Sequence, residues 1–217
     1  MKTTLFLALI LGSAPAFAQA PEVDPARFAE EIGAFAAWDS KNSAPEGAIL
    51  FVGSSSIRLW ATASAFPEQT IINRGFGGSH FSDLNFYYEQ IVKPYDASVI
   101  VVYEGDNDIA HGKTPARVLA DFKKFVDLVR VDSNAAQILF ISIKPSIDRW
   151  EYWPSMTAAN KLIEDFAAHD SSLVYVDLAT PLLDEHGLPR DVYVEDKLHL
   201  NDYGYQLWNK ALAPFLN

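Results

Sequence analysis

The sequence predicts an α/β protein: a three-layer α/β/α sandwich around a five-stranded parallel sheet with a flavodoxin-like strand order. Three observations predict this class. Short apolar runs alternate with segments of helical periodicity along most of the chain. The runs lack the polar–apolar alternation of a half-solvated sheet, so both faces of each strand are expected to be covered. The 217 residues are 49% hydrophobic and 21% charged, as in chains that form a core.

Each expected element has a local signal. Asp24 before Pro25 marks a helix start, and this opening helix is expected to run to about Trp38. The best-marked helix starts with Thr114 as its cap and Pro115 as its first residue. Strands are expected at 49–52, 70–73, 98–103, 137–143 and 173–176. Helices are expected at 56–65, 82–92, 114–130 and 157–169, with a last one after residue 201.

The first twenty residues have the features of a secretory signal. Lys2 supplies a positive charge, residues 5–11 are apolar, and Ala16-Phe17-Ala18 is a small–x–small cleavage site. The apolar run is shorter than the roughly 20 residues that a membrane span needs. We therefore expect residues 1–18 to be cleaved and residues 19–217 to form a single exported domain, periplasmic or secreted.

Composition excludes several classes of protein and site. The chain contains no cysteine, which rules out disulfides, thiolate metal ligands, a cysteine nucleophile and a cysteine-linked lipid anchor. With 28 acidic and 17 basic side chains, its formal net charge is −11. An acidic surface repels nucleic acid and anionic membranes, so neither is an expected partner.

In an open parallel sheet, ligands bind beyond the carboxyl ends of the strands. After the first strand, Gly53-Ser54-Ser55-Ser56-Ile57 places a serine on a tight turn, although a plain helix cap explains it equally well. Ile57 stands where the α/β-hydrolase elbow has its second glycine. After the second strand, three glycines lie in four positions of Gly75-Phe76-Gly77-Gly78, as in a ligand loop or a flexible one. That loop lacks the last glycine of a dinucleotide fingerprint and the lysine of a phosphate loop.

Two further strand ends carry polar clusters. Glu104-Gly105-Asp106-Asn107-Asp108 fails the EF-hand pattern, so it is either a plain turn or a means of aiming the Asn107 amide. Near the chain end, Asp196 and His199 lie three residues apart, about one helical turn. At that distance the carboxylate reaches Nδ1 of the imidazole and leaves Nε2 as a base.

These four peptides, in this order, resemble the blocks of the SGNH hydrolases, also called GDSL-type esterases and lipases. The resemblance covers about residues 49–205 and implies the SGNH fold. It makes Ser55 the nucleophile, His199 the base and Asp196 its partner. It implies an oxyanion hole formed by the backbone N–H groups of Ser55 and Gly78, with Gly77 as the alternative to Gly78, and by the Asn107 amide. The chain departs from the family once, because Ser54 replaces the usual aspartate.

The implied function is an exported serine esterase that hydrolyses short acyl esters of sugars or small alcohols through an acyl-enzyme. It requires no metal or organic cofactor, and its partner is a small-molecule ester. Lysophospholipase, thioesterase and acyltransferase activities use the same residues, and a carbohydrate-binding module on this fold is the non-catalytic alternative. Trp150, Tyr152 and Trp153 either wall an acyl or sugar pocket or pack as a surface loop. The acidic residues beside Asn107 favour a neutral substrate over an anionic one.

Overall fold

The computed structural model describes residues 23–132 and 136–216, so the expected signal peptide, residues 1–18, lies outside the described residues. Within these residues, five parallel strands form one sheet in the order β2-β1-β3-β4-β5. The strands are β1 (Ala48–Gly53), β2 (Ile71–Gly75), β3 (Ala97–Tyr103), β4 (Gln137–Ile141) and β5 (Leu173–Val176). The expected parallel sheet and its flavodoxin-like order are confirmed.

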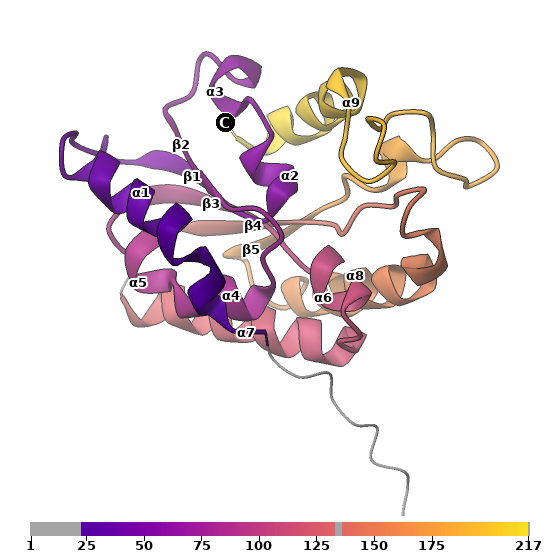
Figure 1. Ribbon diagram of the computed structural model, residues 1–217, viewed down its shortest axis with the longest axis horizontal. Coiled ribbons are helices and arrows are strands. Elements are labelled where there is room, and N and C mark those ends of the chain that lie inside the picture. Colours follow the sequence, from indigo (N-terminus) through magenta and orange to yellow (C-terminus); the bar gives the residue numbers. More distant parts are fainter. Residues whose placement is uncertain (1–22, 133–135, 217) are drawn as a thin grey trace, which may run out of the picture.

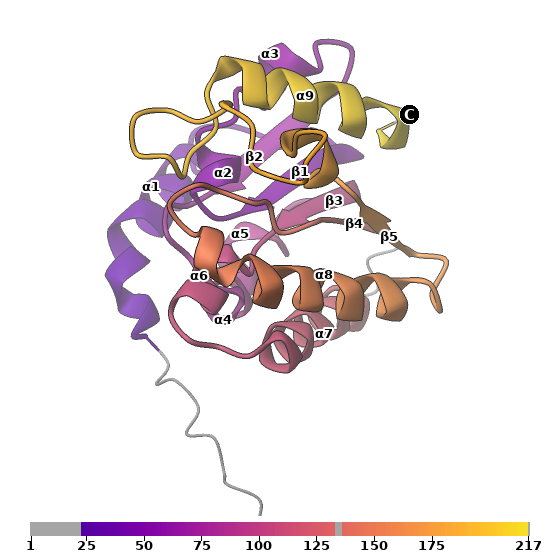
Figure 2. The same cartoon turned by 90° about the vertical axis from the view of Figure 1, so that its right-hand side faces the viewer.

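Helices cover both faces of the sheet, which completes the expected three-layer sandwich (Figures 1 and 2). One face carries α1 (Ala29–Asp39), α4 (Phe81–Phe86), α5 (Tyr88–Ile91), α7 (Pro115–Val131) and α8 (Trp153–Ala167). The other face carries α2 (Ser55–Arg58), α3 (Thr62–Ala65) and α9 (Asp202–Leu212). Short α6 (Asp106–Ala110) follows β3, and 3₁₀ turns occupy Pro25–Phe28, Trp150–Tyr152, Thr180–Leu182 and Ala213–Phe215. Within the described residues, no helix is both long and apolar enough to cross a membrane.

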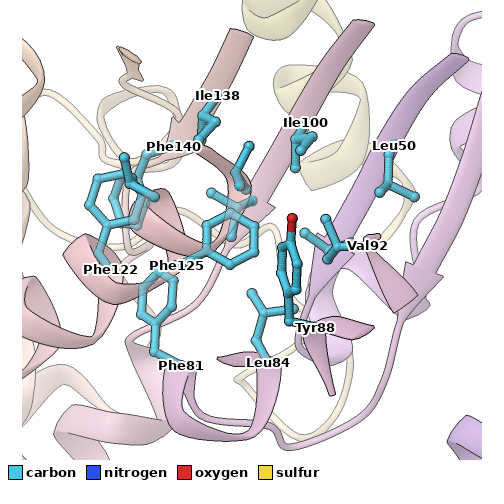
Figure 3. Close-up of a cluster of buried hydrophobic side chains, with 14 of the residues drawn as sticks. Leu50, Phe81, Leu84, Tyr88, Val92, Ile100, Phe122, Phe125, Ile138 and Phe140 are labelled. Atoms are coloured by element: carbon cyan, nitrogen blue, oxygen red, sulfur yellow. The ribbon is translucent and has the colours of Figure 1, made fainter. Parts of the chain in front are cut away.

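The two sheet faces build two separate hydrophobic clusters. Alternate side chains of β1 point to opposite faces, so Leu50 joins the larger cluster and Phe51 the smaller one. Figure 3 shows the larger cluster, in which aromatic rings from the helices lie against the strands. There Phe122 of α7 packs on Phe140 of β4, with ring centroids 5.1 Å apart. These clusters hold the strand ends, where the candidate site lies, in a rigid frame.

The helix expected at residues 56–65 is two helices, α2 and α3. The side chain of Asn73 explains the break. Its Nδ2 donates to the carbonyl oxygens of Ile57 at 2.9 Å and Trp60 at 3.3 Å. Carbonyls bonded in this way no longer need partners within a continuous helix. The helix expected at 82–92 begins at residue 81 and is likewise divided into α4 and α5.

Two other boundaries differ from expectation. The strand expected at 137–143 ends at Ile141, because the backbone of Ile143 bonds to a side chain instead of to a strand. Its N–H donates to Oδ1 of Asn160 at 2.7 Å, and its carbonyl accepts from Nδ2 at 2.9 Å. The helix expected from residue 157 begins at Trp153, with Pro154 in its first turn, a position that proline tolerates.

Candidate active site

Ser55 is the first residue of α2, the helix that follows the carboxyl end of β1 (Figure 1). The turn before it requires glycine at position 53. Gly53 has a φ of 132°, and a Cβ there would lie 2.0 Å from the carbonyl oxygen of Tyr103. Ser54, which replaces the family's aspartate, is buried, and its N–H donates to that same carbonyl at 3.1 Å. The backbone of β3 therefore supports the turn that presents Ser55.

A chain of hydrogen bonds joins Ser55, His199 and Asp196. The Nε2 atom of His199 lies 2.9 Å from Oγ of Ser55, and Nδ1 lies 2.6 Å from Oδ2 of Asp196. Partial burial acts to raise the pKa of Asp196. Hydrogen bonds from the imidazole and from the backbone N–H groups of residues 198 and 199 outweigh it and lower the pKa to about 2. An ionised Asp196 holds the proton on Nδ1, so Nε2 is free to accept the serine hydrogen.

The Asp196–His199 segment is not the helical turn that the spacing predicted. Lys197 has a φ of 60°, a left-handed conformation that ends any helical geometry. The turn is closed by the carboxylate itself, since Oδ1 of Asp196 accepts the N–H groups of Leu198 and His199 at 2.9 Å each. The expected contact between Asp196 and Nδ1 is nevertheless present, because this turn also brings the two side chains together.

The glycine-rich loop and Asn107 also meet at this edge. Asn107 lies in α6 directly after β3, and its Nδ2 donates to the carbonyl oxygen of Ser79 at 2.9 Å. The amide keeps a second N–H for a ligand. Gly78 beside this contact has a left-handed φ of 79°, and a Cβ at Gly77 would lie 2.4 Å from the guanidinium of Arg58. The structure thus brings Asn107 next to the loop that carries Gly78, and it brings Gly77 next to α2, the helix that begins with Ser55.

Two cations also lie in this cluster: Lys144, which sequence reasoning placed on this rim without a role, and Arg149, which it missed. Both contact the buried carboxylate of Asp106, Lys144 through Nζ at 3.2 Å and Arg149 through Nη1. Arg149 also donates to Oδ1 of Asn107 at 3.0 Å. Burial acts to raise the pKa of Asp106, but the two cations lower it below its ordinary value. Their position after the fourth strand was the only signal in the sequence.

The acidic residues beside Asn107 do not form the negative surface that we expected. Asp106 is neutralised by the two cations, and Asp108 lies 3.0 Å from Nζ of Lys113. Burial raises the pKa of Asp108 to about 6 although Lys113 opposes it, and burial together with Asp108 raises that of Glu104 well above its usual range. These contacts remove the ground on which neutral substrates were expected, and the preference itself stays a prediction. Within residues 23–132 and 136–216, no group of three acidic or histidine side chains is placed to hold a metal ion.

A cleft of about 850 Å³ borders Asp196 and His199. Leu59 and Val194 line it, with Tyr203 and Tyr205 from the start of α9. Three of the large side chains that line it are well exposed: Leu59, Val194 and Tyr203, at 50%, 42% and 52%. The cleft therefore offers a substrate apolar and aromatic contacts on the histidine side of the serine.

The aromatic residues after the fourth strand pack against one another. The rings of Trp150 and Trp153 are stacked, with centroids 6.0 Å apart and an angle of 15° between their planes. Both side chains are half-buried, and Tyr152 packs beside the larger hydrophobic cluster. These contacts explain the packing of the segment and leave its role in a substrate pocket a prediction.

Comparisons with known proteins agree with this geometry. The family model of the GDSL-like lipase/acylhydrolase family matches residues 56–207, which include Asn107, Asp196 and His199 and begin one residue after Ser55. Comparison with curated protein sequences gave no significant match.

Solved structures show the same fold. A Streptococcus pneumoniae protein described as a candidate platelet activating factor is 25% identical, with a TM-score of 0.77 over 87% of this chain and 92% of that one. A GDSL-like lipase from Bacteroides thetaiotaomicron is 18% identical, with a TM-score of 0.72 over 89% and 97%. An acetyl-xylooligosaccharide esterase from Geobacillus stearothermophilus is 15% identical, with a TM-score of 0.62 over 79% and 95%.

Proposed function

Because the chain belongs to the GDSL-like lipase/acylhydrolase family and is a carboxylic ester hydrolase, we propose that Ser55, His199 and Asp196 form its catalytic triad. One observation carries this proposal: the continuous hydrogen-bond chain from Oγ of Ser55 through both imidazole nitrogens to Asp196, with links of 2.9 and 2.6 Å. A serine hydroxyl needs an adjacent base to become a nucleophile, and a base in turn needs an orienting group.

In the proposed reaction, His199 takes the hydroxyl proton of Ser55 as its Oγ bonds to the ester carbonyl carbon. The carbonyl oxygen becomes an oxyanion and accepts hydrogen bonds from the N–H groups of Ser55 and Gly78 and from the Asn107 amide. The intermediate collapses, the bond to the alcohol oxygen breaks, and His199 gives its proton to that alcohol. Water then attacks the acyl-enzyme with His199 again as the base, which releases the acid and restores Ser55.

The proposed substrate is an ester with a short acyl group. Asn107 is surrounded by polar groups, namely Arg149, Asp106 and the carbonyl of Ser79. A long alkyl chain beside them would lose favourable apolar contacts and would desolvate charges. In the proposed reaction His199 protonates the leaving alcohol, so the alcohol must lie on the side of His199. We therefore assign the cleft lined by Leu59, Val194 and Tyr203 to the alcohol moiety.

Two assays test the triad. Ser55→Ala is expected to lower kcat on p-nitrophenyl acetate by more than about 10³-fold, because no other group replaces the nucleophile. Ser56→Ala, a neighbouring serine on the same helix, is the matched control and should keep its activity. A fluorophosphonate probe should label the wild type and Ser56→Ala, but not Ser55→Ala. Full activity of Ser55→Ala would contradict the proposal, and an unlabelled wild type without esterase activity would favour a carbohydrate-binding module.

Substrate class and export need separate experiments. On p-nitrophenyl esters from acetate to palmitate, kcat/KM is expected to fall as the chain lengthens, and the opposite trend would point to a lipase or lysophospholipase. Acetylated sugars, acyl thioesters and acceptor alcohols complete the screen and distinguish deacetylase, thioesterase and acyltransferase activity. Export is proposed from the leader alone: mass spectrometry of protein recovered outside the cytoplasm should give an N-terminus at residue 19.

A further inference from the structure

The side-chain amide of Asn107 is held at both ends. Its Nδ2 donates to the carbonyl oxygen of Ser79 at 2.9 Å, and its Oδ1 accepts from Nη1 of Arg149 at 3.0 Å. If the amide were reversed, its N–H groups would face the guanidinium and its oxygen would face a carbonyl, so both contacts would become repulsive. Arg149 and Ser79 thus permit one orientation, and in that orientation the second N–H remains available to a ligand.

Arg149 is itself fixed in place. Its Nη1 also donates to Oδ1 of Asp106, and its backbone N–H donates to Oγ of Ser146 at 3.2 Å. The side chain is only 16% exposed, so little water competes for these bonds. A guanidinium held by a buried carboxylate loses little further freedom when it contacts Asn107.

The same carboxylate connects Asn107 to the segment that carries His199. The other oxygen of Asp106, Oδ2, lies 3.2 Å from Nζ of Lys144, whose side chain is 1% exposed. Nζ of Lys144 also donates to the carbonyl oxygen of Leu198 at 2.8 Å, directly before His199. One buried carboxylate with two cations therefore joins the turn of the base to the helix of the amide donor.

We propose that Arg149 is a positioning residue for ester hydrolysis, orienting the Asn107 amide toward the oxyanion, while Lys144 anchors the His199 turn through the carboxylate that both cations share. The proposal rests on the functions proposed above for Asn107 and His199. The positive charge of the Arg149 guanidinium, which donates to Oδ1, also polarises the amide and strengthens its second N–H as a donor when negative charge develops on the substrate. A purely structural ion pair would affect stability without favouring either catalytic group.

A double-mutant cycle separates these two roles. Asn107→Ala should lower kcat by about 10²–10³-fold with little change in KM, because an oxyanion donor acts mainly in the transition state. Arg149→Met should lower kcat by about 10–100-fold, since the amide loses its orientation but not its N–H groups. In the Asn107→Ala background, Arg149→Met should change kcat by less than about threefold, because its target is gone.

Lys144 serves as a comparison within the same cluster. It contacts the same carboxylate of Asp106, but it bonds to the segment that carries His199 instead of to Asn107. Lys144→Met should lower kcat in the wild type and by the same factor in the Asn107→Ala background. Arg117→Met is the matched control away from the site: Nε of Arg117 lies 2.9 Å from the buried carboxylate of Asp121. It should leave kcat unchanged, and thermal melting should be recorded for every variant.

These experiments can reject the positioning role of Arg149 without rejecting the proposed catalytic triad. Equal fold-losses for Arg149→Met with and without Asn107 would overturn it, as would wild-type kcat in Arg149→Met. Inactive Ser55→Ala beside a fully active Arg149→Met would leave the triad intact and reject only the positioning role. If Arg149→Met does not fold, Arg149→Lys replaces it in the cycle. Lysine keeps the positive charge but lacks the guanidinium fork, so it should orient the amide less well and lower kcat by a smaller factor. The inference is supported if this loss disappears in the Asn107→Ala background.

Discussion

Replacing Asp196 by asparagine changes one atom and should reverse the chemistry of His199. In the structure, Oδ1 of Asp196 accepts two backbone N–H groups at 2.9 Å, while Oδ2 lies 2.6 Å from Nδ1. Asparagine has one acceptor oxygen, and the two N–H groups hold it at the Oδ1 position. Its NH₂ group must then face Nδ1, which can accept that bond only without its own proton.

The imidazole proton therefore moves to Nε2, where it points at Oγ of Ser55, 2.9 Å away. A base with a proton on the reacting nitrogen cannot accept another, so the productive tautomer is lost. For a Ser-His-Asp triad this exchange lowers kcat by about 10⁴-fold. We expect about 10³–10⁴-fold here, which corresponds to about 4–5.5 kcal/mol of transition-state stabilisation at 1.36 kcal/mol per decade.

The assay is steady-state hydrolysis of p-nitrophenyl acetate at pH 7 by the wild type, Asp196→Asn and Asp196→Ala. Asp196→Asn keeps the oxygen that closes the turn but loses the carboxylate charge, so it should melt below the wild type and above Asp196→Ala, which also loses that oxygen. Glu195→Gln removes a neighbouring exposed carboxylate and should change neither kcat nor Tm. A kcat for Asp196→Asn within tenfold of the wild type would refute the tautomer argument.

The same residue links stability to pH. Partial burial acts to raise its pKa, but the hydrogen bonds from the imidazole and backbone lower it from 3.8 to about 2 in the folded protein. The unfolded chain therefore binds a proton at a higher pH than the folded protein does. This contribution to stability is complete above about pH 4 and is lost as the pH falls toward 2. Urea unfolding should show that the stability difference between the wild type and Asp196→Asn shrinks over this interval; a constant difference would contradict it.

Three further predictions concern the frame of the site. Burial, with the nearby charge of Asp108, raises the pKa of Glu104 well above 4.5, so the folded protein keeps a proton that the unfolded chain releases. The stability gained by Glu104→Gln should therefore increase from pH 5 to pH 8 in urea titrations, and a pH-independent gain would contradict this. Gly53→Ala places a Cβ 2.0 Å from the Tyr103 carbonyl oxygen and should cost more than about 3 kcal/mol, lowering Tm by at least about 6 °C in calorimetry; an unchanged Tm would disprove the contact. Phe122→Ala empties a fully buried site and should cost about 3–5 kcal/mol in urea unfolding, and a loss below 1 kcal/mol would show that the cluster collapses to fill it.

Local sequence patterns were sufficient to predict the layers of the fold. Apolar runs and helical periodicity report neighbours within a few residues, so the five strands and the long helix α7 lie close to their expected positions. The errors fall where a distant side chain intervenes. Asn73 divides the expected helix at 56–65, and Asn160 takes the backbone of Ile143 out of β4. Such bonds depend on which segments pack together, and no local pattern records that.

The same distinction between local sequence patterns and contacts of distant segments applies to the candidate site. By itself, the sequence determined which residues are the candidates for the chemistry, because Ser55, Asn107, Asp196 and His199 stand in short blocks at strand ends. Only the tertiary structure decided their geometry: the serine meets an imidazole 144 residues away, and Asp196 and His199 are joined by a turn with Lys197 in a left-handed conformation instead of by a helix.

The tertiary structure also decided the charge around the site. From composition, the acidic residues beside Asn107 had to be counted as negative. In the fold, Lys144 and Arg149, which lie 38 and 43 residues from Asp106, neutralise that carboxylate, and burial raises the pKa of Glu104 well above its usual range. The physical reason is that ionisation depends on desolvation and on charges within a few ångströms, and these distances exist only once the strands have assembled.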